Sequence, residues 1–297
     1  MEQHRIIMVD GRAVHYRDEG RSNGKVLVLL HGFLQSLDVW SSYVLSYMHD
    51  LRVITIDLPG HGHSETFAEV HSTDFMARIV KTVLDEAGVD QCVMVGHSMG
   101  GYVALAFAEK YPYSLRGLGL VNSHALSDSE HHQACRKAVC EQVLENRASY
   151  IVNFVPTLFD DSNRTALSQD IKDLQDQCLE TRAESIIAAQ KGMLARPSRI
   201  GVLQQLEVPV LFVYGKKDNR IPLEIAITQA MLPHHSEILL LDHVGHMSFM
   251  EEREYVKPRI KNFVETCYYR FFVKIRKKIF SIEKLSVHLR YSNKINV

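Results

Sequence analysis

Short apolar runs alternate with stretches of helical periodicity along most of the chain, and this alternation limits the possible folds more than any other feature. Several runs lack the apolar–polar alternation of a half-exposed strand, so we expect buried parallel strands. The expected strands cover residues 5–9 and 13–17 as an opening hairpin, then 25–30, 52–56, 92–95, 115–121, 210–214 and 237–241. The pattern predicts an α/β fold with a mostly parallel, doubly wound sheet whose carboxyl edge holds the ligand site.

The helical stretches fall into two groups. A stretch at 73–87 lies between expected strands, carries apolar residues at helical spacing and has Gly88 as its stop signal. The segment 123–199 contains no convincing strand, and its expected helices cover 133–147, 167–179 and 184–194. We interpret this segment as an inserted helical cap, because a linker would be richer in Gly, Pro and Ser. The remaining sheet core is then expected at 1–122 and 200–267.

The last thirty residues, 268–297, differ in charge from the rest of the chain. They contain eight Lys or Arg residues against a single acidic residue, Glu283, and so form a basic extension. Apolar residues near one helical face allow contact with a membrane surface or a partner. We favour the alternative, a last helix that packs on the body and then frays, and expect deletion of this extension to leave turnover intact.

Composition excludes several classes of protein. A formal net charge of −1 over 297 residues gives no general attraction to nucleic acid. The five cysteines are odd in number and lack C-x-x-C spacing, which indicates free thiols in a reducing compartment. Neither a signal peptide nor a run of about 18 apolar residues occurs, so we expect a cytoplasmic protein. No metal or cofactor is expected, because the pairs His131-His132 and His234-His235 are sequence neighbours and no phosphate-binding glycine loop is present.

The motif Gly96-His97-Ser98-Met99-Gly100 directly follows the expected strand at 92–95 and opens a helical stretch. A serine at such a strand-to-helix turn sits in a strained backbone conformation, and the flanking glycines leave room for the turn. The pattern G-x-S-x-G in this context is typical of a nucleophile elbow. We therefore take Ser98 as the candidate nucleophile.

A serine nucleophile needs a base and a group that orients the base. His246 lies in a glycine-containing loop immediately after the strand at 237–241, which brings it to the same sheet edge as Ser98; His243 is its main rival. Asp218 follows the strand at 210–214 and is the candidate acid. Asp57 also ends a strand, but it precedes Ser98 and begins a turn-rich stretch that we interpret as structural.

Acyl transfer also requires donors for the oxyanion. The backbone N–H of Met99 is one candidate, and the backbone N–H of Phe33, after the strand at 25–30, is the other. His31 in the same loop is expected to shape it. For the substrate site we expect Phe33 together with cap residues, namely Tyr150, Phe154 and Phe159, with Leu158 nearby, although these cap residues could equally pack the cap onto the sheet.

Five segments together resemble the α/β-hydrolase superfamily in its capped esterase and lipase-like branch. They are His31-Gly32-Phe33, Asp57-Leu58-Pro59-Gly60-His61-Gly62-His63-Ser64, Gly96-His97-Ser98-Met99-Gly100-Gly101, Gly215-Lys216-Lys217-Asp218 and Gly245-His246, within residues 5–266. The resemblance implies the α/β-hydrolase fold, Ser98, Asp218 and His246 as triad, and Phe33 and Met99 as oxyanion donors. Haloalkane dehalogenases and epoxide hydrolases of this fold carry aspartate at the nucleophile position, and Ser98 disfavours both.

The expected function is hydrolysis of carboxylic esters of small, partly apolar substrates through an acyl-enzyme, by a monomer or homodimer. A C–C bond hydrolase, a thioesterase and a perhydrolase would use the same triad and stay open as alternatives. A ligand-binding receptor of the same fold is a further alternative, although a pure binder has no physical need for Ser98, Asp218 and His246.

Overall fold

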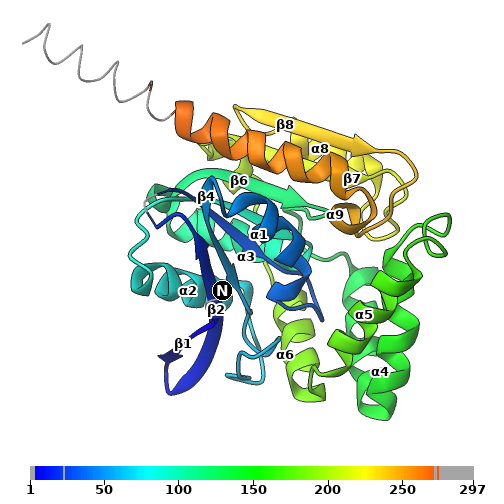
Figure 1. The fold of residues 1–297 in the computed structure, drawn as a ribbon. Helices are drawn as coiled ribbons and strands as arrows, with labels where there is room; N and C mark the ends of the chain where they lie inside the picture. Colours follow the sequence, from blue (N-terminus) through cyan, green and yellow to red (C-terminus); the bar gives the residue numbers. More distant parts are fainter. Residues whose placement is uncertain (1–3, 23, 271–272, 274–297) are drawn as a thin grey trace, which may run out of the picture.

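The computed structural model of the chain describes residues 4–22, 24–270 and 273, and its centre is one eight-stranded sheet (Figure 1). The strands are β1 (His4–Val9), β2 (Arg12–Gly20), β3 (Lys25–Leu30), β4 (Leu51–Ile56), β5 (Cys92–His97), β6 (Leu115–Val121), β7 (Val210–Gly215) and β8 (Ser236–Leu241). They lie in the order β1-β2-β4-β3-β5-β6-β7-β8. Strands β3 to β8 are parallel, while β2 pairs antiparallel with both of its neighbours, β1 and β4. The predicted fold class and all eight predicted strands are confirmed.

The central strands form because both of their faces are buried. All six residues of β5 and β7 are buried, as are five of the six in β3, which explains their continuous apolar sequence. The edge strand β1 is mostly exposed and pairs only with β2. Because β3 and β5 to β8 run in one direction, the loops after these strands gather at a single edge of the sheet.

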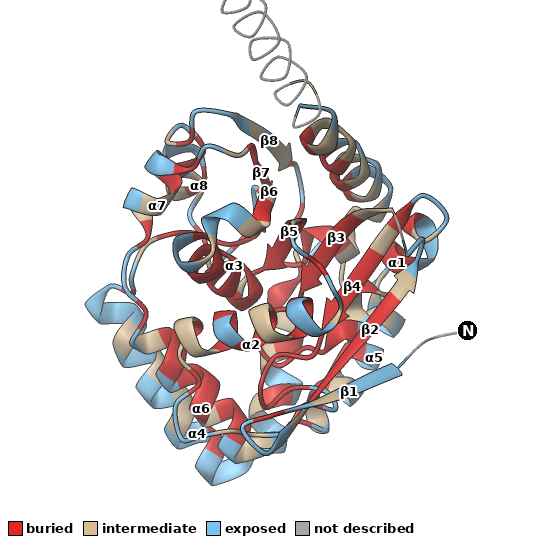
Figure 2. Ribbon diagram, turned by 90° about the vertical axis from the view of Figure 1, so that its left-hand side faces the viewer, coloured by how far each residue is buried: buried red, intermediate tan, exposed pale blue. Residues whose placement is uncertain are grey.

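Helices cover both faces of this sheet (Figures 1 and 2). α1 and the helix at 253–270 lie on one face, and α2, α3 and α8 on the other. The bounds of the helices outside the segment 123–199 are η1 (Leu37–Trp40), α1 (Ser41–Tyr47), α2 (Thr73–Glu86), α3 (Met99–Lys110), η2 (Pro112–Ser114), α7 (Ile200–Gln205), α8 (Leu223–Ala230) and α9 (Ser248–Glu251). The Ser72 side chain caps α2 by accepting a hydrogen bond from the Phe75 N–H. On the first face, the buried rings of Trp40, Tyr43 and Phe249 pack together.

The segment between β6 and β7 is helical. It contains α4 (Glu130–Phe154), η3 (Val155–Leu158), α5 (Ser168–Leu179) and α6 (Ala183–Leu194). The three helices expected there form, and α4 is longer than expected, with a non-helical residue, Asn146, inside it. Figure 1 shows these helices, drawn in green, beside the sheet domain.

The helix at 253–270 includes the first residues of the expected basic extension. Tyr268, placed by the sequence outside the core, has its hydroxyl oxygen 2.8 Å from the Val26 N–H, from which it accepts a hydrogen bond. The Arg116 guanidinium lies 4.7 Å from the Tyr268 ring centre. The helix therefore continues to pack on β3 and β6 past residue 267, and the boundary at 267 stays a prediction. The rest of the expected extension lies outside the described residues, apart from residue 273.

The cysteines and the helices were also checked against the expectations from the sequence. All five cysteines are free thiols, with Cys92, Cys178 and Cys267 buried, as the sequence predicts. Within the part of the chain that is described, no helix combines the length and the apolar character needed to cross a bilayer.

Candidate active site

Ser98 sits at the turn between β5 and α3 in a strained backbone conformation, with φ 49° and ψ −113°. Residues other than glycine rarely adopt this region, and the cost is of order 1–3 kcal/mol. The turn is held on both sides, because the Ser98 N–H donates to the Val121 carbonyl at 3.0 Å and the Gly101 N–H donates to the Ser98 carbonyl at 2.9 Å. Strand pairing and the first turn of α3 together stabilise the strained conformation.

The glycines around Ser98 are required by close backbone contacts. A Cβ atom on Gly96 would lie 2.3 Å from the carbonyl carbon of Gly100, and a Cβ on Gly100 would lie 2.5 Å from the carbonyl oxygen of Leu30. Neither backbone neighbour can move aside as a flexible side chain would. The motif spacing therefore reflects the packing of the turn against itself and against β3.

The structure brings Ser98, His246 and Asp218 into one hydrogen-bonded chain. His246 Nε2 lies 2.9 Å from Ser98 Oγ, and His246 Nδ1 lies 2.9 Å from Asp218 Oδ2 and 3.1 Å from Asp218 Oδ1. The side chains of His246 and Asp218 are 6% and 1% exposed. These distances allow a proton on Ser98 Oγ to pass to His246 Nε2 while Nδ1–H donates to the carboxylate.

Asp218 is held as a carboxylate inside the protein. Burial alone would raise the pKa of Asp218, but attraction to His246 and hydrogen bonds from His246, Asn122 and the Arg220 N–H outweigh burial and lower this pKa. Asn122 Nδ2 donates to Asp218 Oδ2 at 2.8 Å and to the Gly245 carbonyl at 3.1 Å. The residue thereby links the acid to the loop that carries His246.

His97, next to Ser98, also positions the base. Its Nε2 lies 3.0 Å from the His246 carbonyl oxygen, and its Nδ1 lies 3.1 Å from Gln35 Oε1. Burial, together with the neighbouring His246, lowers the pKa of His97 to about 3. This imidazole is therefore neutral at physiological pH and can donate from Nε2 to the His246 backbone.

His243 and Asp57, the alternative candidates for base and acid, make other contacts. His243 is exposed, and its carbonyl oxygen accepts a hydrogen bond from Asn163 Nδ2 at 2.8 Å. Asp57 is buried away from Ser98 and accepts hydrogen bonds from the N–H groups of Leu37 and His63 and from His15 Nδ1. The stretch after Asp57 is therefore structural, as the sequence indicates.

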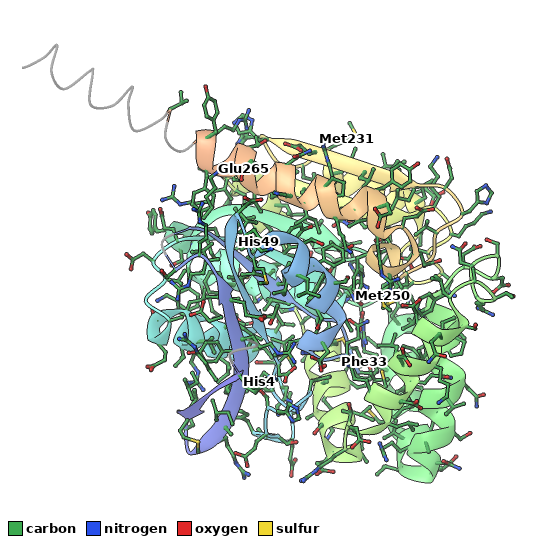
Figure 3. All side chains as sticks on the ribbon, in the orientation of Figure 1. His4, Phe33, His49, Met231, Met250 and Glu265 are labelled. Carbon is green, nitrogen blue, oxygen red and sulfur yellow. The ribbon has the colours of Figure 1, made fainter. Side chains whose placement is uncertain are left out.

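The expected oxyanion donors are the N–H groups of Met99, directly after Ser98, and of Phe33, in the loop after β3. Met99 is the first residue of α3, where an N–H has no partner within the helix. Neither N–H donates to another group among the described residues. Figure 3 shows Phe33 at the junction between the sheet and the green helices. His31 shapes this loop as expected, since its Nε2 accepts from the Leu58 N–H at 2.9 Å and its Nδ1 lies 2.8 Å from the Gly32 carbonyl oxygen.

A cavity of about 290 Å³ opens next to Ser98 between the sheet edge and α4. Its apolar wall includes Phe33, Tyr150, Phe154 and Leu158, in agreement with the sequence interpretation. Phe159 does not line this cavity, which corrects the expected set. It is 2% exposed and packs in the core beside the Gly245 loop, where its own backbone is close to Gly245.

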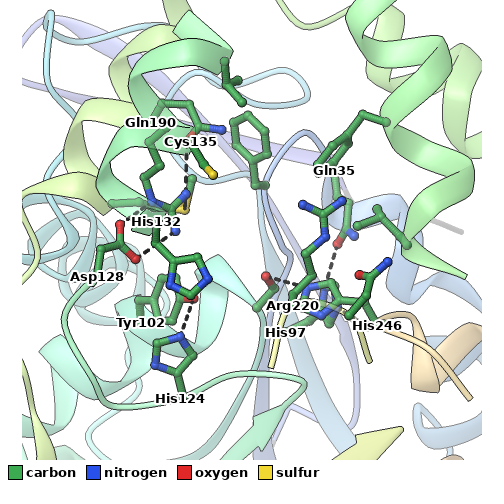
Figure 4. A pocket seen from close by; sticks show the side chains of 18 of the residues that line it. Gln35, His97, Tyr102, His124, Asp128, His132, Cys135, Gln190, Arg220 and His246 are labelled. Atoms are coloured by element: carbon green, nitrogen blue, oxygen red, sulfur yellow. Dashed lines mark hydrogen bonds and ion pairs between the residues drawn. The ribbon is translucent and has the colours of Figure 1, made fainter. Parts of the chain in front are cut away.

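The polar part of the cavity wall was not identified from the sequence. It comprises Gln35, His97, Tyr102, His124, Asp128, His131, His132, Cys135, Arg136, Gln190, Asn219 and Arg220. Figure 4 shows His246 and Arg220 on one side of the cavity and His124, Asp128 and Cys135 on the other. One signal for this wall was present in the chain, since Arg220 is two residues after Asp218. The cap residues offered none, because α4 has no regular apolar face that indicates its orientation.

Comparisons with known proteins concern the fold and the broad class of protein. A family model described as alpha/beta hydrolase fold matches residues 25–159. The chain is 26% identical to a 2-hydroxy-6-oxononadienedioate/2-hydroxy-6-oxononatrienedioate hydrolase of Paraburkholderia phymatum, over 84% of this chain and 90% of the relative. It is 28% identical to a pimeloyl-[acyl-carrier protein] methyl ester esterase of Vibrio parahaemolyticus, over 85% and 98%. The structure is similar to that of a thermophilic esterase from Thermogutta terrifontis solved with malate bound, with a TM-score of 0.83, 29% identity, and coverage of 89% and 99%.

Proposed function

Because the chain belongs to the α/β-hydrolase superfamily, we propose that it is a serine hydrolase that cleaves carboxylic esters through an acyl-enzyme. The observation that carries this proposal is the hydrogen-bonded chain from Ser98 Oγ through His246 to Asp218. Esterases among the relatives and structural neighbours support an ester as substrate.

In the first half of the reaction, Ser98 Oγ attacks the ester carbonyl carbon as His246 Nε2 takes the hydroxyl proton. Negative charge develops on the carbonyl oxygen, and in this proposal the N–H groups of Met99 and Phe33 donate to it. When the tetrahedral intermediate collapses, His246 returns the proton to the leaving alcohol oxygen. Asp218 stays ionised and stabilises the imidazolium that forms in between.

In the second half, water replaces the alcohol. His246 Nε2 accepts a proton from the water as its oxygen attacks the acyl carbon, and the same proton then goes to Ser98 Oγ as the ester bond to the enzyme breaks. The products are a carboxylic acid and the free enzyme. The reaction needs water as its only co-reactant.

The segment 123–199 acts in this proposal as a cap that supplies the apolar substrate wall. Tyr150 and Phe154 belong to α4 and line the cavity with Phe33, and the rings of Phe33 and Phe154 are in edge-to-face contact with their centres 6.0 Å apart. An acyl chain that lies along this apolar wall would be shielded from water. We also retain a cytoplasmic location as a proposal, supported by the five free thiols.

A second candidate activity is hydrolysis of a carbon–carbon bond in an oxo acid. It is favoured by the 26% identity with the 2-hydroxy-6-oxononadienedioate hydrolase over 90% of that protein. The same triad and oxyanion donors would serve both activities. A panel of methyl esters, acyl thioesters and a diketone-like acid in steady-state assays separates the candidates, and turnover of the diketone alone would replace the ester as substrate.

The nucleophile is tested by labelling with a fluorophosphonate. Wild type is expected to become covalently labelled, and Ser98→Ala is expected to lose labelling and about 10⁴-fold in ester turnover if the triad acts as a unit. Ser46→Ala, at an exposed position on α1, is the matched control and should behave as wild type. Equal labelling of wild type and Ser98→Ala would show that another residue is the nucleophile.

A further inference from the structure

Arg220 is a cationic side chain in the cavity wall whose hydrogen-bonding capacity is only partly used. One terminal nitrogen donates to Thr157 Oγ1 at 2.8 Å, and the guanidinium carbon lies 4.7 Å from the Phe154 ring centre. Its Nε is shielded from solvent and has no partner among the described residues. The nearby Asp218 carboxylate pairs with His246, and among the described residues Arg220 forms no ion pair, although burying an unpaired charge is costly.

Tyr150 presents a second donor without an acceptor at the same wall. Its hydroxyl oxygen is buried and has no hydrogen-bond partner within the described ranges. The Tyr150 ring stacks on Phe154 with ring centres 5.3 Å apart, so one aromatic ring contacts both donors. Burial raises the pKa of Tyr150, and burial lowers the pKa of Arg220 despite the nearby Tyr150 and Asp218. Both groups retain their protons at neutral pH, so the guanidinium can only donate and the Tyr150 hydroxyl has a proton to donate.

The far side of the cavity adds positive charge. Asp128 is shared by two arginines, since it pairs with Arg136 and, at 2.7 Å, with Arg196. Two guanidinium groups facing one carboxylate leave one excess positive charge. Asp128 is also the single acidic residue in the cavity lining. The cavity is therefore cationic although the whole chain has a net charge of −1.

Arg220 lies on the same side of the cavity as His246, and both line the space next to Ser98 (Figure 4). A ligand held by Arg220 and Tyr150 would leave its other end at Ser98. Phe33 and Phe154 contact each other edge to face and form an apolar wall beside this space, which suits a short methylene chain.

We propose that Arg220 and Tyr150 form a carboxylate-binding subsite, and that the substrate is the monoester of a short dicarboxylic acid. The free carboxylate accepts charge-assisted hydrogen bonds from the guanidinium and a hydrogen bond from the Tyr150 hydroxyl, and so supplies the acceptors that both groups lack. The ester end then reaches Ser98. This substrate assignment rests on the proposed ester hydrolysis.

Two substrates of matched shape test the proposal. Monomethyl glutarate carries the carboxylate, and methyl 5-methylhexanoate replaces it with an uncharged isopropyl group. Wild type is expected to prefer the charged ester by at least about tenfold in kcat/KM. Arg220→Gln should reduce this preference by about tenfold and Tyr150→Phe by about threefold, mainly through KM. Arg182→Gln, whose side chain is 80% exposed, is the matched control and should keep the wild-type preference.

A parallel fall in turnover of both esters in Arg220→Gln, with an unchanged preference, would overturn the assignment and make Arg220 a structural residue. So would a wild-type enzyme that turns over the uncharged ester equally well. If neither ester is hydrolysed and the fluorophosphonate fails to label Ser98, the proposed function fails instead.

Direct binding tests the subsite without turnover. Calorimetric titration of Ser98→Ala with glutarate is expected to give saturable binding that weakens at least about tenfold when Arg220→Gln is added. The double variant with Arg182→Gln should bind as Ser98→Ala does. Absence of saturable binding, or equally tight binding of inorganic phosphate, would exclude a carboxylate-specific subsite.

Discussion

At the residue scale, the candidate site depends on a few groups whose preferred states are overridden by their surroundings. Ser98 adopts a positive φ because strand pairing and α3 hold its turn, and Asp218 keeps its charge although it is buried. Asn122 also has a positive φ, of 45°, which asparagine tolerates better than most residues. Each exception lies within hydrogen-bond reach of Ser98, His246 or Asp218.

Asn122→Ala should reduce both activity and stability. The change removes the donors to Asp218 and to the Gly245 carbonyl and leaves an alanine at a positive φ. We expect about 2 kcal/mol lower free energy of unfolding, because a buried carboxylate loses a hydrogen bond, and at least about tenfold lower kcat. Denaturant unfolding and steady-state ester assays measure the two effects. Wild-type kcat in a folded Asn122→Ala protein would contradict the positioning role.

Because His61 is buried, we expect the free energy of unfolding to decrease in acid. Burial and the nearby His31 lower the pKa of His61 to about 3 from 6.5, while Asp57 only partly opposes this, and His71 adds to it. Between these pH values the unfolded chain binds a proton that the folded chain excludes. Stability is therefore complete above about pH 6.5 and is lost as pH falls toward 3, by at most about 1.4 kcal/mol per pH unit for this group.

His61→Gln should make this pH dependence shallower by up to one proton. Unfolding in urea at pH 7 and pH 5 gives the two free energies, and the difference between them should be smaller in His61→Gln than in wild type. His97 and His124, with pKa values of about 3, keep part of the slope. Parallel pH curves for the two proteins would show that His61 does not contribute.

At the element scale, the cavity depends on how α4 and α6 meet the sheet domain. α6 approaches the loop before α2 so closely that a Cβ atom on Gly192 would lie 1.8 Å from the His71 carbonyl oxygen. The His71 N–H donates to the Ala188 carbonyl of the same helix at 3.0 Å. This contact fixes the position of Gln190 and Met193, which line the cavity.

Gly192→Ala should therefore push α6 away from the His71 backbone. We expect about 3 kcal/mol lower free energy of unfolding and weaker ester turnover, because a backbone atom cannot yield to the new Cβ. Gly201→Ala is the matched control, since a Cβ there meets nothing within 4 Å and alanine favours the helix α7. Thermal melts and ester assays of both variants measure the two effects. Equal melting temperatures for Gly192→Ala and Gly201→Ala would show that the close approach of Gly192 to His71 does not contribute to stability.

At the scale of the whole molecule, one sheet edge gathers groups from distant parts of the chain. Ser98, Asp218 and His246 follow β5, β7 and β8, and their convergence needs the complete strand order. The helix at 253–270 packs closely on β6. A Cβ atom on Gly117 in that strand would lie 2.4 Å from Cys267 Sγ. Sheet and last helix thus form one packed body.

Shortening the chain at two positions tests how far the packed part of this last helix extends. A protein ending at residue 267 loses Tyr268, its hydrogen bond with the Val26 N–H and its contact with Arg116, whereas one ending at 270 keeps them. We expect the shorter protein to be about 2 kcal/mol less stable, which lowers Tm by about 4–8 °C relative to the longer one. Equal Tm values for the two proteins would show that the packed core ends at residue 267.

The sequence by itself determined the eight strands, the helical segment at 123–199 and the residues that meet at Ser98. These features depend on local periodicity and on chain order at one sheet edge, both of which can be read along the chain. Tertiary structure alone decided that Phe159 packs in the core, that Tyr268 belongs to the body, and that Arg220 and Tyr150 face the same cavity. The physical reason is that burial and missing hydrogen-bond partners are set by neighbours far away in sequence, and no local pattern records them.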